Sequence, residues 1–376
     1  MGRQIRIEGG HVIDPRRDMD GPGTVTVEGD RIAEERPAQN GQVIDARGLY
    51  VLPGFIDFHT HLFEGSAFGI TPELFPPSGV TAAVDAGTTG VINFNEFYRN
   101  TWKTSRIHLK AFLNVSPIGQ PGGGVMEPLN PECIQWERML EMLEQYPDIL
   151  LGLKIRISRG IVKDLGLKPL EDTFRFAERH GLRVNVHITD PPEPLEEIIP
   201  MFRPGDIVCH MYQGSGHTIL GVDKSVGRCF WEAKERGVLF DAANGRSNFD
   251  YDVAREALAQ GFLPDIISTD ATALNYNQPE QVKNLPFVMS KYLSLGMKLN
   301  QVVRAVTAFP AALMGMEGEI GTLSPGAWAD VVICRLREET VRFRDTKGTI
   351  HYGNQLLEPV WVMSKGRIVY CRPDFS

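Results

Sequence analysis

Six side chains that could bind metal ions stand in or directly after hydrophobic, β-branched segments of the chain. His59 and His61 follow the first of these segments, and because they are two residues apart, a strand would place both on one face. The other candidates are one lysine, two histidines and one aspartate in later segments: Lys154, His187, His210 and Asp270. A single histidine at a strand end is more often an ordinary polar residue than a ligand. Six candidates at equivalent positions favour a metal site, since imidazole and carboxylate groups bind Zn²⁺ and similar ions.

The segments that carry these residues alternate with segments of helical pattern. Eight strands are expected, at 51–58, 79–85, 107–113, 149–157, 182–188, 206–209, 238–242 and 265–269. Helical patterns occupy 133–146, 169–180, 250–260, 279–295 and 299–315, and a long loop is expected at 119–132. This alternation indicates parallel βαβ units, and eight units predict an α/β fold of the (β/α)8 TIM-barrel type. Active sites of such barrels lie at the carboxyl ends of the strands, which is where the six candidates fall.

Short β-rich segments occur at both ends of the chain. They lie at 4–8, 24–28 and 42–44, and again at 330–335, 360–363 and 367–371. Neither set is large enough to be stable alone, so we expect the two termini to form one small β-sandwich domain. The predicted division assigns residues 1–53 and 319–376 to this composite domain and residues 54–318 to the barrel.

The composition excludes several classes of protein. Hydrophobic residues make up 42% and charged residues 23% of the chain, which excludes a mainly disordered sequence. A net charge of −8 disfavours nucleic-acid and anionic-membrane partners. The absence of an apolar membrane span or signal-peptide core, together with five cysteines and no CxxC motif, leads us to expect a cytoplasmic protein. The expected partner is a small-molecule substrate, and the composition is compatible with a homo-oligomer.

On its motifs the chain resembles the amidohydrolase superfamily. The similarity rests on PGFIDFHTH at 53–61, LGLKIRIS at 151–158, His187, His210, STDAT at 268–272, and a segment at 307–333 that returns from the barrel. A narrower likeness to dihydroorotase-like amidohydrolases and deacetylases rests on DAGTTG at 85–90, KIRIS at 154–158 and HITDPP at 187–192. One segment departs from the pattern, because NGRSNFDY at 244–251 has Asn244 where relatives often carry histidine. No substrate role is therefore carried over to Asn244.

The resemblance implies a centre of two divalent metal ions, most suitably Zn²⁺. His59, His61 and Asp270 would hold the inner ion, and His187 and His210 the outer one. Lys154 would bridge both as a carbamate formed with CO2, since an ammonium group beside two dications is disfavoured and the free amine can react. Cys209 adjoins His210 in the sequence, but we interpret it as a core thiol.

The resemblance also implies the reaction, which is hydrolysis of an amide or ester. Two metals that share a bridging hydroxide lower the pKa of water from 15.7 toward about 7, and Asp270 would carry the proton to the leaving group. Three residues are candidates for substrate contact. Arg156 shares a face with Lys154 and could pair with a carboxylate or, equally, with a barrel residue. His217 in a glycine-rich loop and Thr88 after the second strand are the others, and a solvent-exposed loop and an ordinary turn explain them as well.

Four functions were compared on these features. A metal-dependent deacetylase or deacylase is the best single prediction, and a cyclic amide hydrolase of dihydroorotase or hydantoinase type is the alternative. A deaminase is less favoured, because deaminases of this superfamily typically use one metal and an HxxE motif. Here His187 is followed by Asp190, and Lys154 would have no function. A non-catalytic scaffold would have no reason to retain six metal ligands.

Overall fold

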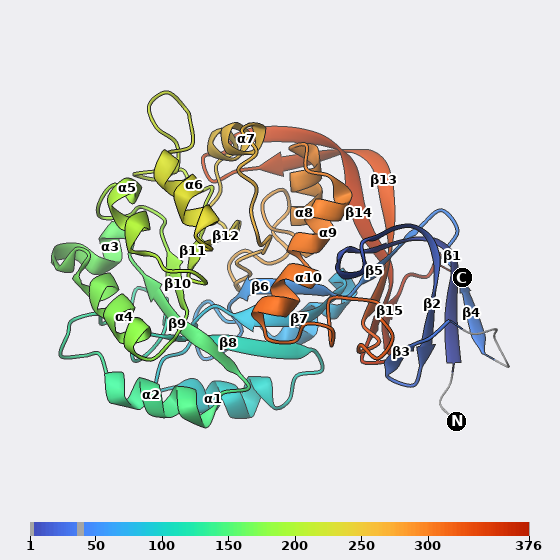
Figure 1. Ribbon diagram of the computed structural model, residues 1–376, viewed down its shortest axis with the longest axis horizontal. Coiled ribbons are helices and arrows are strands. Elements are labelled where there is room, and N and C mark those ends of the chain that lie inside the picture. The colour runs from blue at the N-terminus through green and yellow to red at the C-terminus, as the bar shows by residue number, and fades with distance from the viewer. Residues whose placement is uncertain (1–3, 36–40, 376) are drawn as a thin grey trace.

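The computed structural model describes residues 4–35 and 41–375, and it contains two β-sheets with helices around one of them (Figure 1). The predicted composite domain includes residues 1–3, 36–40 and 376, which lie outside the described residues. No helix in the described ranges combines the length and the apolar character needed to span a membrane.

Seven parallel strands form the curled sheet, and five of the six candidate ligands lie in these strands or directly after them. Their order is β12-β11-β10-β9-β8-β7-β6, so strands that follow one another in the chain are neighbours in the sheet. Their bounds are β6 Phe55–Thr60, β7 Val80–Asp85, β8 His108–Asn114, β9 Leu150–Arg156, β10 Val184–His187, β11 Ile207–Cys209 and β12 Leu239–Asp241. These strands correspond to the first seven of the eight predicted segments.

The predicted eighth strand at 265–269 is wrong, because this segment forms only single bridges to its neighbours. Ile266 is bridged to Asp241 on one side, and Ala271 is bridged to Thr60 on the other, so the segment still closes the ring between β12 and β6. Between the bridges, the backbone N–H and side-chain hydroxyl of Thr269 both donate to the carboxylate of Asp57. Backbone hydrogen bonds to the β12 side remain, for example from the Asn244 N–H to the Ser268 carbonyl oxygen at 3.1 Å, and on the β6 side the bonds to Asp57 hold the segment in place of a regular ladder.

The first predicted barrel strand, 51–58, is divided at Gly54 into two strands of different sheets. β5 (Tyr50–Pro53) pairs with the C-terminal strand β13, whereas β6 starts the barrel. A side chain at Gly54 has no space, because a Cβ atom there would lie 2.1 Å from Thr81 Oγ1 and 2.8 Å from the Cβ of Asp330. The chain therefore passes from one sheet to the other at a residue without a side chain.

The helices lie outside the curled sheet (Figure 1). The longer ones are α2 Trp136–Gln145, α4 Lys168–Arg179, α6 Arg228–Glu235, α7 Tyr251–Ala259, α8 Leu285–Ser294, α9 Leu299–Ala305 and α10 Ala308–Leu313. Single-turn helices are α1 Phe94–Phe97, α3 Arg159–Val162 and α5 Leu195–Ile198. The predicted helical segments are confirmed with two exceptions: the segment 279–295 is helical only from Leu285, and 299–315 is two helices with a break between them. The predicted loop at 119–132 contains neither helix nor strand.

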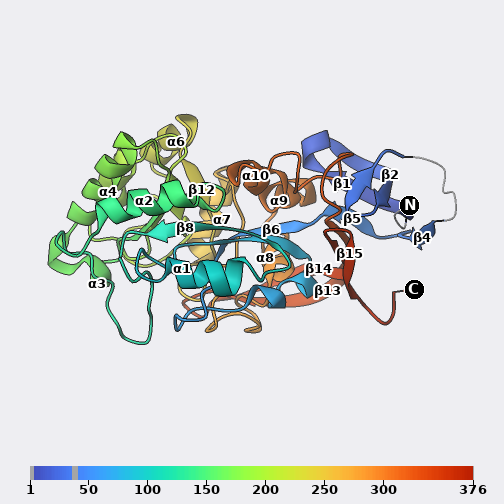
Figure 2. The ribbon, with the colours of Figure 1, turned by 90° about the horizontal axis from the view of Figure 1, so that it is seen from below.

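The second sheet joins both ends of the chain. Its order is β15-β14-β13-β5-β1-β2-β3, with β4 paired to β1, and Figure 2 shows these N- and C-terminal strands together at one end of the molecule. The remaining bounds are β1 Gln4–Asp14, β2 Met19–Glu28, β3 Arg31–Ala33, β4 Gln42–Asp45, β13 Val331–Arg344, β14 Ile350–Ser364 and β15 Arg367–Cys371. One mixed sheet is present, and its division into a sandwich stays a prediction.

The hairpin of β13 and β14 is much longer than the predicted strands at 330–335 and 360–363. It extends from the terminal sheet across α8, where Ser290 Oγ receives a hydrogen bond from the Leu357 backbone N–H at 2.8 Å (Figure 1). Charged residues fill much of this extension, but Val341, Phe343 and Leu357 are buried. The hairpin therefore connects the two sheets over one side of the barrel.

Candidate metal centre

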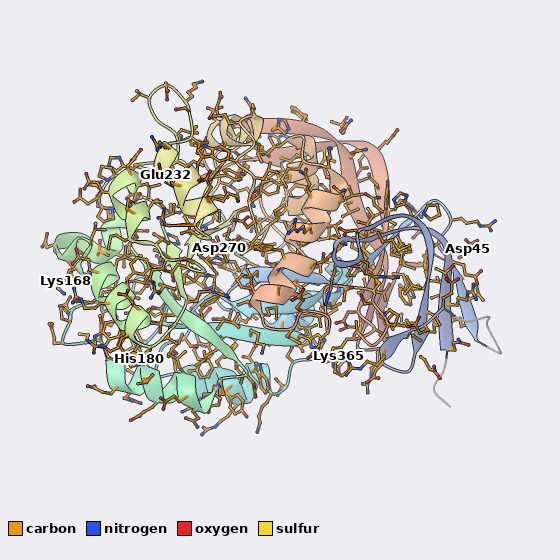
Figure 3. The ribbon with its side chains drawn as sticks, viewed as in Figure 1. Asp45, Lys168, His180, Glu232, Asp270 and Lys365 are labelled. Carbon is orange, nitrogen blue, oxygen red and sulfur yellow. The ribbon has the colours of Figure 1, made fainter. Side chains whose placement is uncertain are left out.

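The fold brings the six predicted ligands to one end of the curled sheet. β6 carries His59 and leads into His61, and Lys154 lies in β9. His187 ends β10 and His210 follows β11, while Asp270 lies in the irregular segment that closes the ring, near the centre of the α/β unit (Figure 3). Five of the six are buried and His187 is half-buried. Parallel strands direct all their carboxyl ends the same way, which explains why residues so far apart in sequence meet here.

His59, His61 and Asp270 form the tightest group of potential ligands. One donor atom from each lies within 4.8 Å of the others. The Nε2 atom of His61 is 3.1 Å from Asp270 Oδ1, and that of His59 is 3.7 Å from the same oxygen. Two nitrogens and one oxygen thus face a common point, as the ligands of a divalent cation do.

The second nitrogen of each buried histidine ring is held by another group. His59 Nδ1 lies 3.2 Å from Asp241 Oδ2, and His61 Nδ1 lies 2.8 Å from Thr88 Oγ1. His210 Nδ1 lies 2.7 Å from the carbonyl oxygen of Ala243, which can only accept, so this nitrogen carries the hydrogen. A partner of this kind fixes the ring orientation of a metal-binding histidine.

His210 Nε2 is the clearest sign that the centre fits a metal ion. Because Nδ1 carries the hydrogen, Nε2 has a free lone pair, and this buried atom has no hydrogen-bond partner among the described residues. A buried polar atom without a partner is costly in a folded protein. The ring of His210 lies 4.4 Å from that of His187 and 5.0 Å from that of His59, measured between centroids. Coordination of a cation would satisfy this atom.

The electrostatics of the centre favour the neutral form of His59, His187 and His210. Burial, followed by the positive charge of Lys154, lowers the pKa of His59 well below its ordinary value. Burial and the neighbouring His210 do the same for His187, and burial lowers the pKa of His210 to about 4. Neutral imidazole is the form that binds metal.

Asp270 remains ionised in the same surroundings. Burial acts to raise the pKa of this carboxyl group, but the contact with His61 and the neighbouring His210 bring it below its ordinary value. Asp270 and His210 also both have positive φ angles, of 51° and 67°, which are uncommon for residues with side chains. Such backbone strain is concentrated at functional sites in proteins.

Lys154 lies fully buried beside this group. Its Nζ atom is 2.8 Å from Asn185 Oδ1 and 3.7 Å from Cys209 Sγ. Gly87, from the DAGTTG motif, has a φ angle of 82°, and a Cβ atom there would lie only 2.4 Å from the Cβ of Lys154. The loop after β7 can therefore pass Lys154 only with glycine at this position.

A cavity of about 250 Å³ opens onto the centre. Its floor includes His59, His61, His187 and Asp270, and its wall includes the apolar side chains of Phe68 and Leu274. The polar part of the wall consists of Gln120, Arg156, Ser158, Thr189, Arg246, Ser247, Asn248, Thr272 and Asn275. A mixed apolar and polar wall above convergent ligands is typical of a small-molecule site.

The three predicted substrate contacts have different positions. Arg156 lines the cavity, and it also donates to Gln120 Oε1 at 3.0 Å and forms a 3.3 Å ion pair with Glu127 in the loop 119–132. Thr88 is buried against His61, so its side chain orients a candidate ligand. His217 is exposed in its loop, and neither it nor Thr88 is among the cavity-lining residues of the described chain.

Several residues of the site were missed by sequence reasoning. Asp241 contacts His59, Asn185 contacts Lys154, and Asn248 donates to Asp270 Oδ2 at 2.7 Å. Arg246 lines the cavity. Asp241 and Asn185 were detectable as polar residues inside apolar strand segments. Arg246 and Asn248 belong to NGRSNFDY, whose only signal in the sequence is its departure from the pattern of relatives.

Comparison with known proteins agrees with this geometry. Residues 208–369 match the family model described as the amidohydrolase family, and residues 42–96 match a second model with the same description. A deacetylase from Agrobacterium fabrum is 32% identical over 342 residues, which cover 90% of this chain and 83% of the relative. The structure is similar to that of an adenine deaminase, with a TM-score of 0.89 and 26% identity over 98% of this chain and 100% of that one. It is also similar to a dihydroorotase structure, with a TM-score of 0.88 and 28% identity over 98% of both chains.

Proposed function

This chain belongs to the amidohydrolase family of hydrolytic enzymes, and from that premise we propose that it removes an acyl group from a small molecule by hydrolysing an amide or ester bond. The observation that carries the proposal is the donor set of His59, His61 and Asp270 beside the unpartnered Nε2 atom of His210, at the floor of a cavity. The likeness to a deacetylase over most of both chains supports the deacylase assignment.

The cofactor of the proposed reaction is a pair of divalent metal ions, with Zn²⁺ as the best fit to nitrogen and oxygen ligands. His59, His61 and Asp270 would hold one ion, and His187 with His210 would hold the other. Lys154, carboxylated by CO2, would bridge the pair. The neutral state of the buried imidazoles and the burial of Lys154 beside them support this assignment.

When bound, such metals activate water and polarise a carbonyl group. The side chains of this chain would supply the remaining steps. Asp270 has one oxygen directed toward the two histidines of the β6 end, while the other oxygen is held by Asn248. A carboxylate fixed in this way can take a proton from the attacking water and deliver it to the leaving group, as a general base and then a general acid.

The substrate class follows from the polar wall of the cavity. Arg156 and Arg246 both line it, and Arg246 has no ion-pair partner among the described residues. A guanidinium group beside the reacting bond favours a substrate with a carboxylate. We therefore propose an acylated amino acid or acylated hydroxy acid, small enough for a cavity of about 250 Å³.

Hydrolysis of a cyclic amide is the second candidate, and the structural likeness to a dihydroorotase favours it. The two candidates share the metal centre and Asp270, so they differ only in the shape of the substrate. Because the structure is also similar to that of an adenine deaminase, adenine has to be included in the substrate screen.

The deciding experiment is a substrate screen with the metal-loaded enzyme. N-acetyl amino acids, acetylated hydroxy acids, cyclic ureides and adenine would be compared, and release of acetate from the first two classes is expected. Turnover of cyclic ureides alone, or release of ammonia from adenine, would replace the deacylase proposal. The matched control is Lys154→Ala, which should lose bound metal as well as activity, and full metal content in this variant would contradict the bridging role of Lys154.

A further inference from the structure

Lys154, Asn185 and Cys209 form a closed group of side chains on three neighbouring strands. Lys154 in β9 and Asn185 in β10 are directly opposite each other in the register, and Cys209 ends β11. Asn185 Oδ1 lies 2.8 Å from Lys154 Nζ and 2.6 Å from Cys209 Sγ. All three side chains have zero solvent exposure. The amine of Lys154 is thus held from one side by a defined partner.

The donor and acceptor roles in this group are unambiguous. The carbonyl oxygen of an amide can only accept, so both Lys154 Nζ and Cys209 Sγ donate to Asn185 Oδ1. The thiol occupies the second lone pair of the oxygen and holds the amide in its orientation. Asn185 Nδ2 has no partner among the described residues, so the amide is not held from its nitrogen side. The side-chain contacts that the structure gives Asn185 are therefore both made by its oxygen, one with Lys154 and one with Cys209.

We propose that Asn185 is the positioning residue for the carboxylation of Lys154, an inference that rests on the proposed bridging carbamate. In this step the Lys154 ammonium first loses a proton, and the free amine then bonds to the carbon of CO2. A second proton leaves the nitrogen, so the product is a carbamate anion and two protons are released in total. One N–H remains on the nitrogen, and Asn185 Oδ1 is placed to accept it.

The geometry of a carbamate explains why this one contact matters. Its nitrogen is planar, with Cε, the hydrogen and the carboxylate carbon about 120° apart. When the hydrogen points to Asn185, rotation about the Cε–Nζ bond is fixed and the carboxylate turns away from Asn185. Without the acceptor, the N–H would be buried without a partner, and the carbamate would lose both its stabilising contact and its orientation.

The test measures the carbamate itself. Protein equilibrated with ¹³C-labelled bicarbonate would be analysed by ¹³C NMR, and bound metal would be counted on the same samples. Asn185→Leu removes the acceptor with little change in size, and we expect carbamate occupancy to fall about tenfold, as for the loss of one buried hydrogen bond. Asn185→Asp keeps an oxygen in place but adds a negative charge that stabilises the Lys154 ammonium and repels the carbamate anion, so its carbamate occupancy should also fall below that of the parent. Cys209→Ala, which removes the thiol that donates to Asn185 and lies 3.7 Å from Lys154 Nζ, should cause a smaller loss.

The Lys154→Ala variant is used to separate a role of Asn185 in orienting the carbamate from a general structural role. In Lys154→Ala, an added short carboxylic acid can replace the carbamate, but it has no N–H. Adding Asn185→Leu to this variant should leave the carboxylate-restored metal content unchanged. Equal carbamate signals in the parent, Asn185→Leu and Asn185→Asp would overturn the role of Asn185 alone, as would the same loss of metal in both backgrounds. Absence of the ¹³C signal from the parent would instead contradict the proposed bridging carbamate, and the role of Asn185 would be rejected with it.

Discussion

Asn248 donates a hydrogen bond from Nδ2 to Oδ2 of Asp270 across 2.7 Å. Its own Oδ1 accepts a hydrogen bond from Thr189 Oγ1 at 2.8 Å, so the amide is fixed at both ends. The other oxygen of Asp270 faces Nε2 of His61. The two oxygens of one carboxylate therefore have separate neighbours, and the loop after β12 sets the plane of the group.

The first prediction concerns this contact. Asn248→Ala should lower kcat by about 10- to 100-fold while bound metal is retained, because Asp270 would lose the restraint on its proton-carrying oxygen. Steady-state kinetics with metal analysis on the same samples measure both effects. Asn130→Ala, at an exposed position, is the matched control. An unchanged kcat would show that Asp270 is held sufficiently by its other contacts.

Asp241 contacts His59, one of the candidate metal ligands. Its Oδ2 faces Nδ1 of His59, and its Oδ1 accepts a hydrogen bond from Ser268 Oγ at 2.6 Å. Asp241→Asn keeps the size of the side chain but weakens the hold on the imidazole, so metal affinity should fall about 10- to 100-fold. Competition with a chelator of known affinity measures the change. If the parent and Asp241→Asn lose metal at the same chelator concentration, Asp241 does not affect the metal affinity.

Arg246 provides a test of substrate charge. If the cavity accepts a carboxylate, Arg246→Gln should raise KM for the acylated acid about tenfold or more and change kcat less, because binding is weakened in ground state and transition state alike. Arg175→Gln on the outer face of α4 is the matched control. The corresponding carboxamide substrate should show little difference between the parent and Arg246→Gln. A selective loss of kcat would assign Arg246 to the chemical step instead.

Lys291 makes the stability of the chain depend on pH. This buried side chain contacts Asn244 Oδ1 and the Gln281 carbonyl oxygen, each at 3.1 Å. Burial lowers its pKa to about 7, whereas a lysine of the unfolded chain titrates near 10.4. Between these values the unfolded chain binds more protons, so the free energy of unfolding rises with pH, and the full cost of burying the charge remains below pH 7.

Lys291→Met should remove this dependence. Relative to the parent, the variant should have its full stability advantage at pH 7 and below, and this advantage should shrink by roughly 1.4 kcal/mol per pH unit between about pH 7.5 and 9.5. Denaturant unfolding at several pH values gives these free energies. Lys283→Met, at an exposed position, serves as the control. Parallel pH profiles for the parent and Lys291→Met would show that the lysine does not titrate in this range.

The ring of strands and the meeting of the candidate ligands at one face could be predicted from sequence for one physical reason. Buried parallel strands are short apolar runs, and all of them direct their carboxyl ends to one face. His59, His187 and His210 stand at the ends of such runs and therefore indicate where the candidate site lies. The segment 265–269 is also apolar at its start, but Ser268 and Thr269 donate hydrogen bonds to the side chains of Asp241 and Asp57 on other strands. The local sequence pattern does not predict these partners.

The residues that orient the ligands were not predictable in the same way. Asn185 is paired with Lys154 through the register of β9 and β10, and Asn248 meets Asp270 only because the loop after β12 folds back over the cavity. An amide inside a strand or loop has many local explanations. The hydrogen-bond partner of such an amide depends on which strands and loops are neighbours in the fold, and a single sequence does not reveal this. The hairpin of β13 and β14 was underestimated for a similar reason, since its charged residues obscure the few apolar ones that pack on α8.

Asp270 carries the last and most direct prediction. As a ligand it needs one oxygen at the metal, and as a proton carrier it needs the other within roughly 2.6–3.2 Å of the attacking water. Its two oxygens have separate neighbours, so one residue can meet both demands. Asn keeps the size and one carbonyl oxygen but cannot carry the proton. Asp270→Asn should therefore retain much of its metal and lose about 10²-fold or more in kcat.

The pH profile supplies the control for this variant. The contact with His61 and the neighbouring His210 keep the pKa of Asp270 low in spite of its burial, so the parent should hold its base form at neutral pH and lose activity only on acidification. The acid limb of kcat/KM should report the coupled centre rather than one residue, and it should change shape in Asp270→Asn. A near-normal kcat in Asp270→Asn with full metal occupancy would show that another group moves the proton.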